Sequence, residues 1–254
     1  MNQHELDSPL KIEFDDGPHP RAQIGFIAVA NADLTETDMF KMRPAGVGLH
    51  FTRVRMPEKC TVSSLSSMEN ALDDAIASLA PARTDYDVIC YNCTAGSFII
   101  GETKIVEKII NRRSGVKGTT LLTGVVAALK TLNVRRIVMA TAYTEDINDL
   151  ESQYFVSQGF DVLDIRGMDL MTDMEMNRVS LRSLKDFAVA MDRPDADAIF
   201  MSCGALRSTD VIETVETETG KPFIGSNQAS MWHCLRLAGI KDRIEGFGHL
   251  FRFC

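Results

Sequence analysis

Short apolar runs alternate along the chain with longer stretches in which apolar residues recur every three or four positions. The runs at 24–30, 49–54, 87–92 and 137–142 are typical of buried strands. A stretch with helical spacing follows the second run, with apolar residues at Leu65, Met68, Leu72, Ile76 and Leu79. Alternating strands and helices predict an α/β protein whose mostly parallel sheet is flanked by helices.

The pattern repeats about 110 residues further along the chain. The segment 85–95 resembles 195–205, and each places a cysteine directly after an apolar run, at Cys93 and Cys203. Further pairs follow in the same order at nearly the same offset: Gly48 with Gly159, Val54 with Ile165, and Arg55 with Arg166. Such self-similarity indicates two copies of one structural unit. We therefore predict two pseudo-symmetric, doubly wound halves with an active site in the cleft between them.

The boundary between the halves follows from a second similarity. Residues 116–134 and 222–240 each combine a short extended piece, a polar tip and an apolar helix. The C-terminal segment is therefore expected to return to the first half. The predicted first half comprises 1–115 and 226–254, with 1–20 as a loose N-terminal arm, and the predicted second half comprises 116–225.

Four residues whose side chains can react with or bind a ligand follow directly after predicted strands: Asn31, Cys93, Tyr143 and Cys203. Ligands bind beyond the carboxyl ends of parallel strands, so the two cysteine loops are expected to face each other. Small residues follow each thiol, namely Thr94 and Ala95, and Gly204 and Ala205. Turns of this kind leave backbone N–H groups free for a carboxylate or an enolate-like oxygen. A helix beginning there is expected to lower the thiol pKa.

A symmetric pair of thiols suits chemistry at a single carbon centre. A thiolate on one face can remove a proton while a thiol on the other face returns one, which inverts the centre. Alternatively, a thiolate can add to an activated double bond, allow rotation about the new single bond, and leave. Neither route needs a cofactor.

Composition and charge exclude several other classes of function. The formal net charge of −8 argues against binding to a nucleic-acid backbone. No apolar run is long enough to cross a membrane. The first twenty residues are polar and acidic, unlike a signal peptide, so we expect a cytoplasmic protein with reduced thiols. Cys90 and Cys93 form a C-x-x-C pair without a second pair to complete a zinc site, and we expect no metal.

The cysteine motifs carry a family resemblance. The segments 92–96 (NCTAG) and 202–207 (SCGALR) resemble the aspartate/glutamate racemase superfamily, in the branch that holds maleate cis–trans isomerases, arylmalonate decarboxylases and racemase-like proteins of ectoine utilisation. Residues 226–233 are similar to the C-terminal signature of this branch. Taken over all these motifs, the sequence is most similar to the ectoine-utilisation group.

The resemblance implies roles for particular residues. Cys93 matches the first catalytic cysteine, which is the nucleophile in maleate isomerases and an acid or base in racemases. Cys203 matches the second cysteine, a proton donor or base. Asn31 and Tyr143 match residues that bind a substrate carboxylate, and Thr94 matches an anion-binding residue of the decarboxylases.

Two further positions bear on ligand binding. Asn227, in the polar turn before the last long helix, is a further candidate for contact with the ligand. Maleate isomerases carry another binding asparagine where this chain has Asp173 or, with a shifted alignment, Asn177. A carboxylate there would repel a dicarboxylate unless it were protonated.

The leading hypothesis is a cofactor-independent isomerase, either a racemase or a cis–trans isomerase, that acts on a small carboxylate or amino-acid derivative, with ectoine breakdown as a candidate setting. The first alternative is a decarboxylase or other lyase of the arylmalonate type, although those decarboxylases lack the first cysteine. The second is a non-catalytic binding protein for small carboxylates. The resemblance also implies a homodimer or a higher homo-oligomer.

Overall fold

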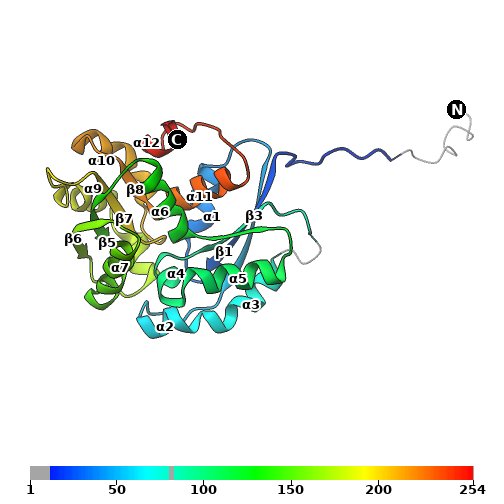
Figure 1. Ribbon diagram of the computed structural model, residues 1–254, viewed down its shortest axis with the longest axis horizontal. Helices are drawn as coiled ribbons and strands as arrows, with labels where there is room; N and C mark the ends of the chain where they lie inside the picture. Colours follow the sequence, from blue (N-terminus) through cyan, green and yellow to red (C-terminus); the bar gives the residue numbers. More distant parts are fainter. Residues whose placement is uncertain (1–11, 80–82, 254) are drawn as a thin grey trace, which may run out of the picture.

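Two parallel four-stranded sheets stand side by side in the computed structural model, which describes residues 12–79 and 83–253 (Figure 1). The first sheet has the order β2-β1-β3-β4 and the second has the order β6-β5-β7-β8. The strands are β1 (Ala22–Val29), β2 (Val47–Val54), β3 (Val88–Asn92), β4 (Lys117–Thr120), β5 (Arg136–Thr141), β6 (Asp161–Gly167), β7 (Ala198–Ser202) and β8 (Phe223–Gly225). The identical order confirms the predicted α/β class with two pseudo-symmetric halves.

Helices cover the sheets and connect their strands. Around the first sheet lie α1 (Leu34–Lys41), α2 (Val62–Ser67), α3 (Glu69–Ser78), α4 (Thr94–Ile100) and α5 (Glu102–Arg112). The remaining helices are α6 (Leu121–Thr131), α7 (Glu145–Ser157), α8 (Asp173–Arg178), α9 (Leu181–Ala190), α10 (Ile212–Thr219), α11 (Ser226–Leu237) and α12 (Gly248–Phe253), with a 3₁₀ turn, η2 (Ser208–Asp210). None of the helices in the described ranges is long and apolar enough to cross a membrane.

The central strands are buried on both faces, as the sequence predicts. Every residue of β3 and of β7 is buried, which explains why these strands read as continuous apolar runs rather than as alternating patterns. Of the predicted N-terminal arm, residues 12–20 contain no helix or strand and are mostly exposed, whereas residues 1–11 lie outside the described residues (Figure 1).

Two helices, α6 and α11, occupy equivalent places in the repeat and pack against each other. Each begins directly after the fourth strand of its sheet. Apolar residues of both helices join one core cluster with residues from both sheets, including Phe26 of β1 and Phe200 of β7. The helices approach closely at Gly124, where an added Cβ would lie 2.9 Å from the Ala229 carbonyl oxygen. This contact helps to set how the two halves face each other.

The chain crosses from one sheet to the other through α6. Because β4 pairs with β3, residues 117–120 belong to the first sheet, although they lie beyond the predicted cut at 115. The last long helix, α11, contacts β3 and α1 of the first half, as expected for a returning C-terminal segment. The division into domains, with 1–115 plus 226–254 against 116–225, stays a prediction.

The close approach of α6 and α11 predicts that Gly124→Ala destabilises the protein. The added methyl group would collide with backbone, so the helices must shift, at a cost of about 1–3 kcal/mol in the free energy of unfolding. Urea unfolding would measure the change. Gly118→Ala is the control, because its Cβ would meet only side-chain carbons at 3.3 Å. Equal effects of the two changes would contradict the prediction.

Candidate active site

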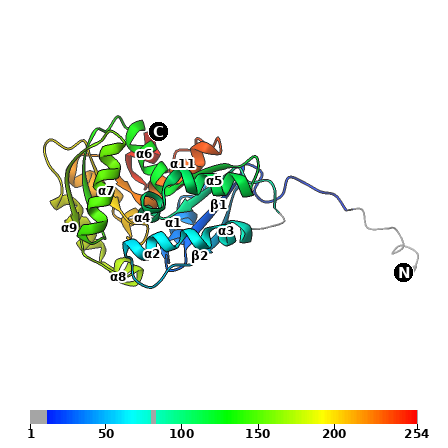
Figure 2. The same cartoon turned by 60° about the horizontal axis from the view of Figure 1, so that its bottom comes forward.

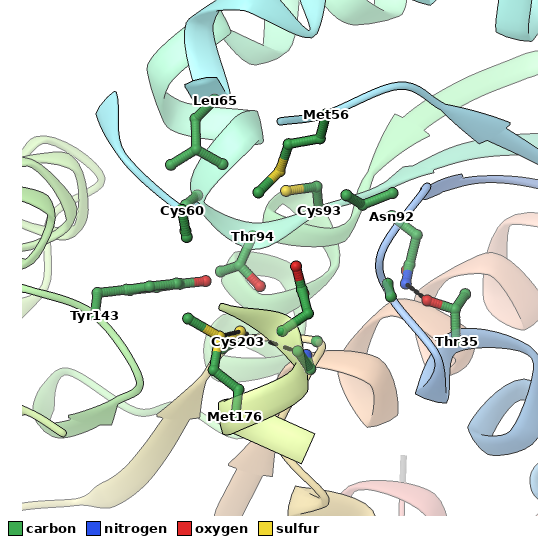
Figure 3. A pocket seen from close by; sticks show the side chains of 16 residues that line it. Thr35, Met56, Cys60, Leu65, Asn92, Cys93, Thr94, Tyr143, Met176 and Cys203 are labelled. Atoms are coloured by element: carbon green, nitrogen blue, oxygen red, sulfur yellow. Dashed lines mark hydrogen bonds between the residues drawn. The ribbon is translucent and has the colours of Figure 1, made fainter. Parts of the chain in front are cut away.

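One pocket brings together the loops that follow β3 and β7 (Figure 3). The room for water-sized molecules inside it is small, about 30 Å³, so only a small ligand would fit, and tightly. In the close view, Cys93 and Cys203 lie on opposite sides of this space, and the Tyr143 hydroxyl points into it. The lining consists of Val29, Ala32, Thr35, Met56, Cys60, Leu65, Asn92, Cys93, Thr94, Ala95, Tyr143, Asp173, Met176, Cys203, Gly204 and Ala205.

Cys93 is the N-cap residue of α4. Its Sγ accepts a hydrogen bond from the Gly96 N–H at 3.3 Å, in the way that a serine or threonine oxygen caps a helix. The N–H groups of Thr94 and Ala95, in the first turn, find no acceptor among the described residues. Gly96 has to be small here, because a Cβ would lie 2.3 Å from the Tyr91 hydroxyl. The helix start therefore offers donors beside the thiol.

Cys203 is held in a different and strained turn. Its φ of 120° is one that residues other than glycine rarely adopt. The Sγ atom accepts a hydrogen bond from the Ala205 N–H at 3.4 Å, and the thiol donates to Met176 Sδ at 3.6 Å. The Cys203 N–H donates to Ser226 Oγ at 3.0 Å. These contacts hold the Cys203 backbone against the first turn of α11 and its thiol against Met176 of α8.

The expectation that the loop geometry lowers the thiol pKa is wrong. Burial raises the pKa of both Cys93 and Cys203 to about 12, and the nearby carboxylate of Asp173 acts in the same direction. The hydrogen bonds from Gly96 and Ala205 lower these pKa values, as expected, but by less than burial raises them. Both thiols are therefore protonated at neutral pH in the absence of a ligand.

Five of the sequence-predicted binding residues line this pocket: Thr94, Ala95, Tyr143, Gly204 and Ala205. The structure places Asn31 outside it. The Asn31 amide donates to the Pro57 carbonyl oxygen at 3.2 Å, and the residue lines an adjoining hollow that shares Asp173 with the thiol pocket. The sequence repeat put Asn31 and Tyr143 at equivalent positions, but their side chains reach different spaces.

Asn227 lies directly behind the pocket rather than in its lining. It is fully buried, and its amide nitrogen donates to the Gly204 carbonyl oxygen and to Asp38 Oδ2, both at 2.9 Å. Its amide oxygen accepts from Asn92 at 3.1 Å. Asn227 therefore links the loop after Cys203 to the end of β3 and supports both thiol loops from beneath.

The sequence analysis did not single out several pocket residues. Asn92 precedes Cys93 and donates to Thr35 Oγ1 at 3.4 Å, and Thr35 also lines the pocket. Cys60 supplies a third thiol to the lining. Position at the end of β3 could have identified Asn92, since its counterpart in the repeat, Ser202, is also buried. No signal in the sequence marks Cys60, because it reaches the pocket from a loop.

The two halves close on each other at the mouth of the pocket. Lys59 forms an antiparallel β-bridge with Thr172, and the Cys60 N–H donates to the Met171 carbonyl oxygen at 2.7 Å. These contacts lie just before α2 and α8, which stand beside each other in Figure 2. Asn177 donates to Asp33 at 3.1 Å across the same junction and is absent from the pocket lining. Asp173, rather than Asn177, therefore faces the thiol pocket.

A family model described as arylmalonate decarboxylase matches residues 60–251, which hold both cysteine loops. The chain belongs to the arylmalonate decarboxylase family. This membership confirms the resemblance that the cysteine motifs carry. Among the described residues, no cluster of three His, Cys, Asp or Glu side chains could hold a metal ion.

The matches to individual relatives cover different lengths of this chain. The chain is 34% identical over 141 residues to an arylmalonate decarboxylase of Bordetella bronchiseptica, a match that spans 54% of this chain and 59% of that enzyme's length. It is 23% identical to a maleate isomerase of Pseudomonas putida over 90% of this chain and 96% of that enzyme.

Solved structures have the same fold. A maleate cis–trans isomerase variant of Nocardia farcinica with a covalently bound succinylcysteine intermediate superposes with a TM-score of 0.84 at 22% identity, covering 91% of this chain and 98% of that one. A liganded double variant of arylmalonate decarboxylase gives a TM-score of 0.81 at 26% identity, with the same coverage.

The strained backbone at Cys203 predicts that its glycine and alanine variants follow an unusual order of stability. Glycine relieves a positive φ worth about 1–3 kcal/mol, so Cys203→Gly should unfold with a free energy at least as high as that of Cys203→Ala. At Cys90, inside β3 and without a positive φ, the glycine variant should instead be the less stable by roughly 1 kcal/mol. Urea unfolding of the four variants measures both differences. The same ranking at both positions would disprove strain at Cys203.

Glu151, beneath the Cys203 loop, predicts a pH dependence of stability. It is fully buried and accepts a hydrogen bond from Ser202 at 2.5 Å, and burial raises its pKa from 4.5 to about 8. Between these values the folded protein holds a proton that the unfolded chain loses, so this group lowers stability as pH rises, by up to about 1.4 kcal/mol per pH unit.

Glu151→Gln should remove that contribution. The free energy of unfolding, measured at pH 6.5 and 7.5, should then fall less steeply with pH in Glu151→Gln than in the wild type. Glu145→Gln, an exposed change on the same helix, should leave the slope as it is. An unaltered slope in Glu151→Gln would mean that the buried carboxyl group is already ionised at pH 6.5.

Proposed function

We propose that this protein is a cofactor-independent isomerase that acts on a small carboxylate through Cys93 and Cys203. The observation that carries the proposal is the presence of both thiols on opposite sides of one small pocket (Figure 3). One thiol first loses its proton to solvent; the resulting thiolate can take a proton from a carbon atom on one face, and the other thiol can give its proton to the opposite face.

The substrate carboxylate would be held by backbone donors. The N–H groups of Thr94 and Ala95 find no acceptor among the described residues, nor does that of Gly204, and all three residues line the pocket. Such donors stabilise the negative charge that develops on the carboxylate when the adjacent carbon loses its proton. The Tyr143 hydroxyl is a further donor to the same group. Asn227 would act indirectly, by positioning Gly204, and Asn31 stays a predicted carboxylate ligand.

Racemisation and cis–trans isomerisation use these groups differently. In racemisation the thiols exchange protons with one carbon, and no covalent bond to sulfur forms. In cis–trans isomerisation a thiolate adds to a carbon–carbon double bond, and the adduct rotates before the thiolate leaves. The succinylcysteine intermediate reported for the Nocardia maleate isomerase is an adduct of the second kind. Because this chain has the same fold as that enzyme, the covalent route is a candidate here beside racemisation.

Decarboxylation is the second candidate function. The relative with 34% identity is named as an arylmalonate decarboxylase. Such a reaction would release carbon dioxide and protonate the resulting carbanion from one face only, so one of the two thiols would be dispensable. A role in ectoine breakdown, a cytoplasmic location and a homodimer or higher oligomer stay predictions beside either function.

Replacement of either cysteine by alanine tests the proposal. The wild-type protein, incubated in D₂O with a panel of small carboxylates, should place deuterium at the α-carbon or change the geometry of a double bond, as followed by NMR. Cys93→Ala and Cys203→Ala should each reduce this turnover by roughly 10²–10⁴-fold, because each removes one proton-transfer or nucleophilic group. Cys234→Ala is the matched control, since Cys234 is buried in α11 away from the pocket.

Three results distinguish the candidates. Full activity of both pocket variants would refute the cysteine mechanism. Carbon dioxide release that survives Cys93→Ala would favour the decarboxylase. Saturable ligand binding without turnover of any substrate in the panel would favour a binding protein.

A further inference from the structure

One carboxylate stands out in the thiol pocket. Asp173 is the charged residue among the described residues that line the pocket, and no lysine, arginine or histidine lies in that lining. Asp173 is the first residue of α8 and is partly buried. Its carboxylate accepts a hydrogen bond from its own backbone N–H, and no other described residue gives it a hydrogen bond or an ion pair. A partly buried, unpaired carboxylate in a ligand pocket is costly unless a ligand compensates it.

The hollow next to the pocket is also lined by acidic side chains. Asp173 also lines the adjoining hollow, together with Asp33 and Glu58, and no cationic side chain is part of that lining within the described ranges. Burial, and to a smaller extent the charge of Asp33, raises the pKa of Asp173 to about 6. The carboxylate is therefore mostly ionised at pH 7.5, and the mouth of the site is negative.

We propose that Asp173 makes this site select a ligand that carries a single carboxylate and, facing Asp173, a positively charged nitrogen. The inference rests on the proposed function for the location of the site. The ligand carboxylate would occupy the free N–H donors beside the thiols. A second carboxylate would meet the charge of Asp173 in a poorly solvated space, where like charges repel strongly. A cationic nitrogen would instead form the ion pair that Asp173 lacks.

The same charge links binding to reactivity. The Asp173 carboxylate opposes ionisation of both Cys93 and Cys203, since it raises the pKa of each thiol. A bound positive nitrogen would neutralise this effect, and a second carboxylate would increase it. The thiols would thus form a thiolate more readily with a ligand of the selected class than with a dicarboxylate.

Two small probes of matched length test the selection. Succinate and 4-aminobutyrate share a carboxylate and a chain, but one ends in a second carboxylate and the other in an ammonium group. Dissociation constants measured by isothermal titration calorimetry at pH 7.5 and low salt should favour 4-aminobutyrate by about tenfold or more in the wild-type protein. In Asp173→Asn, which keeps the size of the side chain, the ratio should fall to about one or reverse.

Two further variants separate charge from structure. Asp173→Glu keeps the charge and should keep most of the preference. Asp33→Asn removes the same charge from the adjoining hollow and should change the ratio by less than about twofold, because exposed charges are well screened. Equal affinity for the two probes in the wild type, no binding of 4-aminobutyrate, or an unchanged ratio in Asp173→Asn would overturn the inference.

The calorimetry needs no turnover, so the two proposals fail separately. Deuterium exchange that is insensitive to both cysteine variants, with the probe preference intact, would remove the proposed function and leave the selectivity. Loss of exchange in the cysteine variants without any probe preference would do the opposite.

Discussion

Removal of two thiols from water is the constraint on which the site depends. Burial raises the pKa of Cys93 and Cys203 to about 12, far above neutral pH. Backbone N–H groups point at both sulfur atoms and lower these values only in part. The free protein therefore holds two protonated thiols, with donors already aimed at them. Any thiolate has to form in the presence of a ligand that changes the charge around it.

The doubled fold places the thiols symmetrically but supports them by different means. Cys93 caps a helix through a bond from Gly96, three residues on, whereas Cys203 occupies a positive-φ turn with a bond from Ala205, two residues on. Each thiol has its own tyrosine: the Tyr143 hydroxyl lowers the pKa of Cys203, and the Tyr91 hydroxyl lowers that of Cys93. The two sulfur atoms thus have different local supports, although burial brings the pKa of both to about 12.

Much of the fold was predictable because it depends on local pattern. The buried strands read as apolar runs, the helices as three- and four-residue periodicity, and the repeat as a constant offset between the loops of Cys93 and Cys203. β4 lies beyond the predicted cut at 115, and Lys117–Thr120 has only two buried residues and little apolar character. Only its pairing with β3 assigns it to the first sheet.

The site was predictable where it follows a strand and unpredictable where it comes from a loop. Position after β3, β5 and β7 identified Cys93, Tyr143 and Cys203. Desolvation of the thiols could not be inferred, because it depends on how Cys60 and other side chains from distant segments close over them. Asn31 shows the limit of the repeat: it follows β1 as Tyr143 follows β5, yet its amide bonds to Pro57 and the residue lies outside the pocket lining.

The contact between the two halves beside the pocket connects the position of Asp173 with the environment of the thiols. The bridge between Lys59 and Thr172 joins the two halves immediately beside Cys60 and Asp173, both of which line the pocket. A ligand in the thiol pocket therefore lies beside the segment that carries Asp173. Cys93 follows β3 of the first sheet and Asp173 follows β6 of the second, so a ligand that contacts both would bridge the two sheets. The charge of Asp173 would then act twice, first on which ligand remains bound and then on whether the buried thiols ionise.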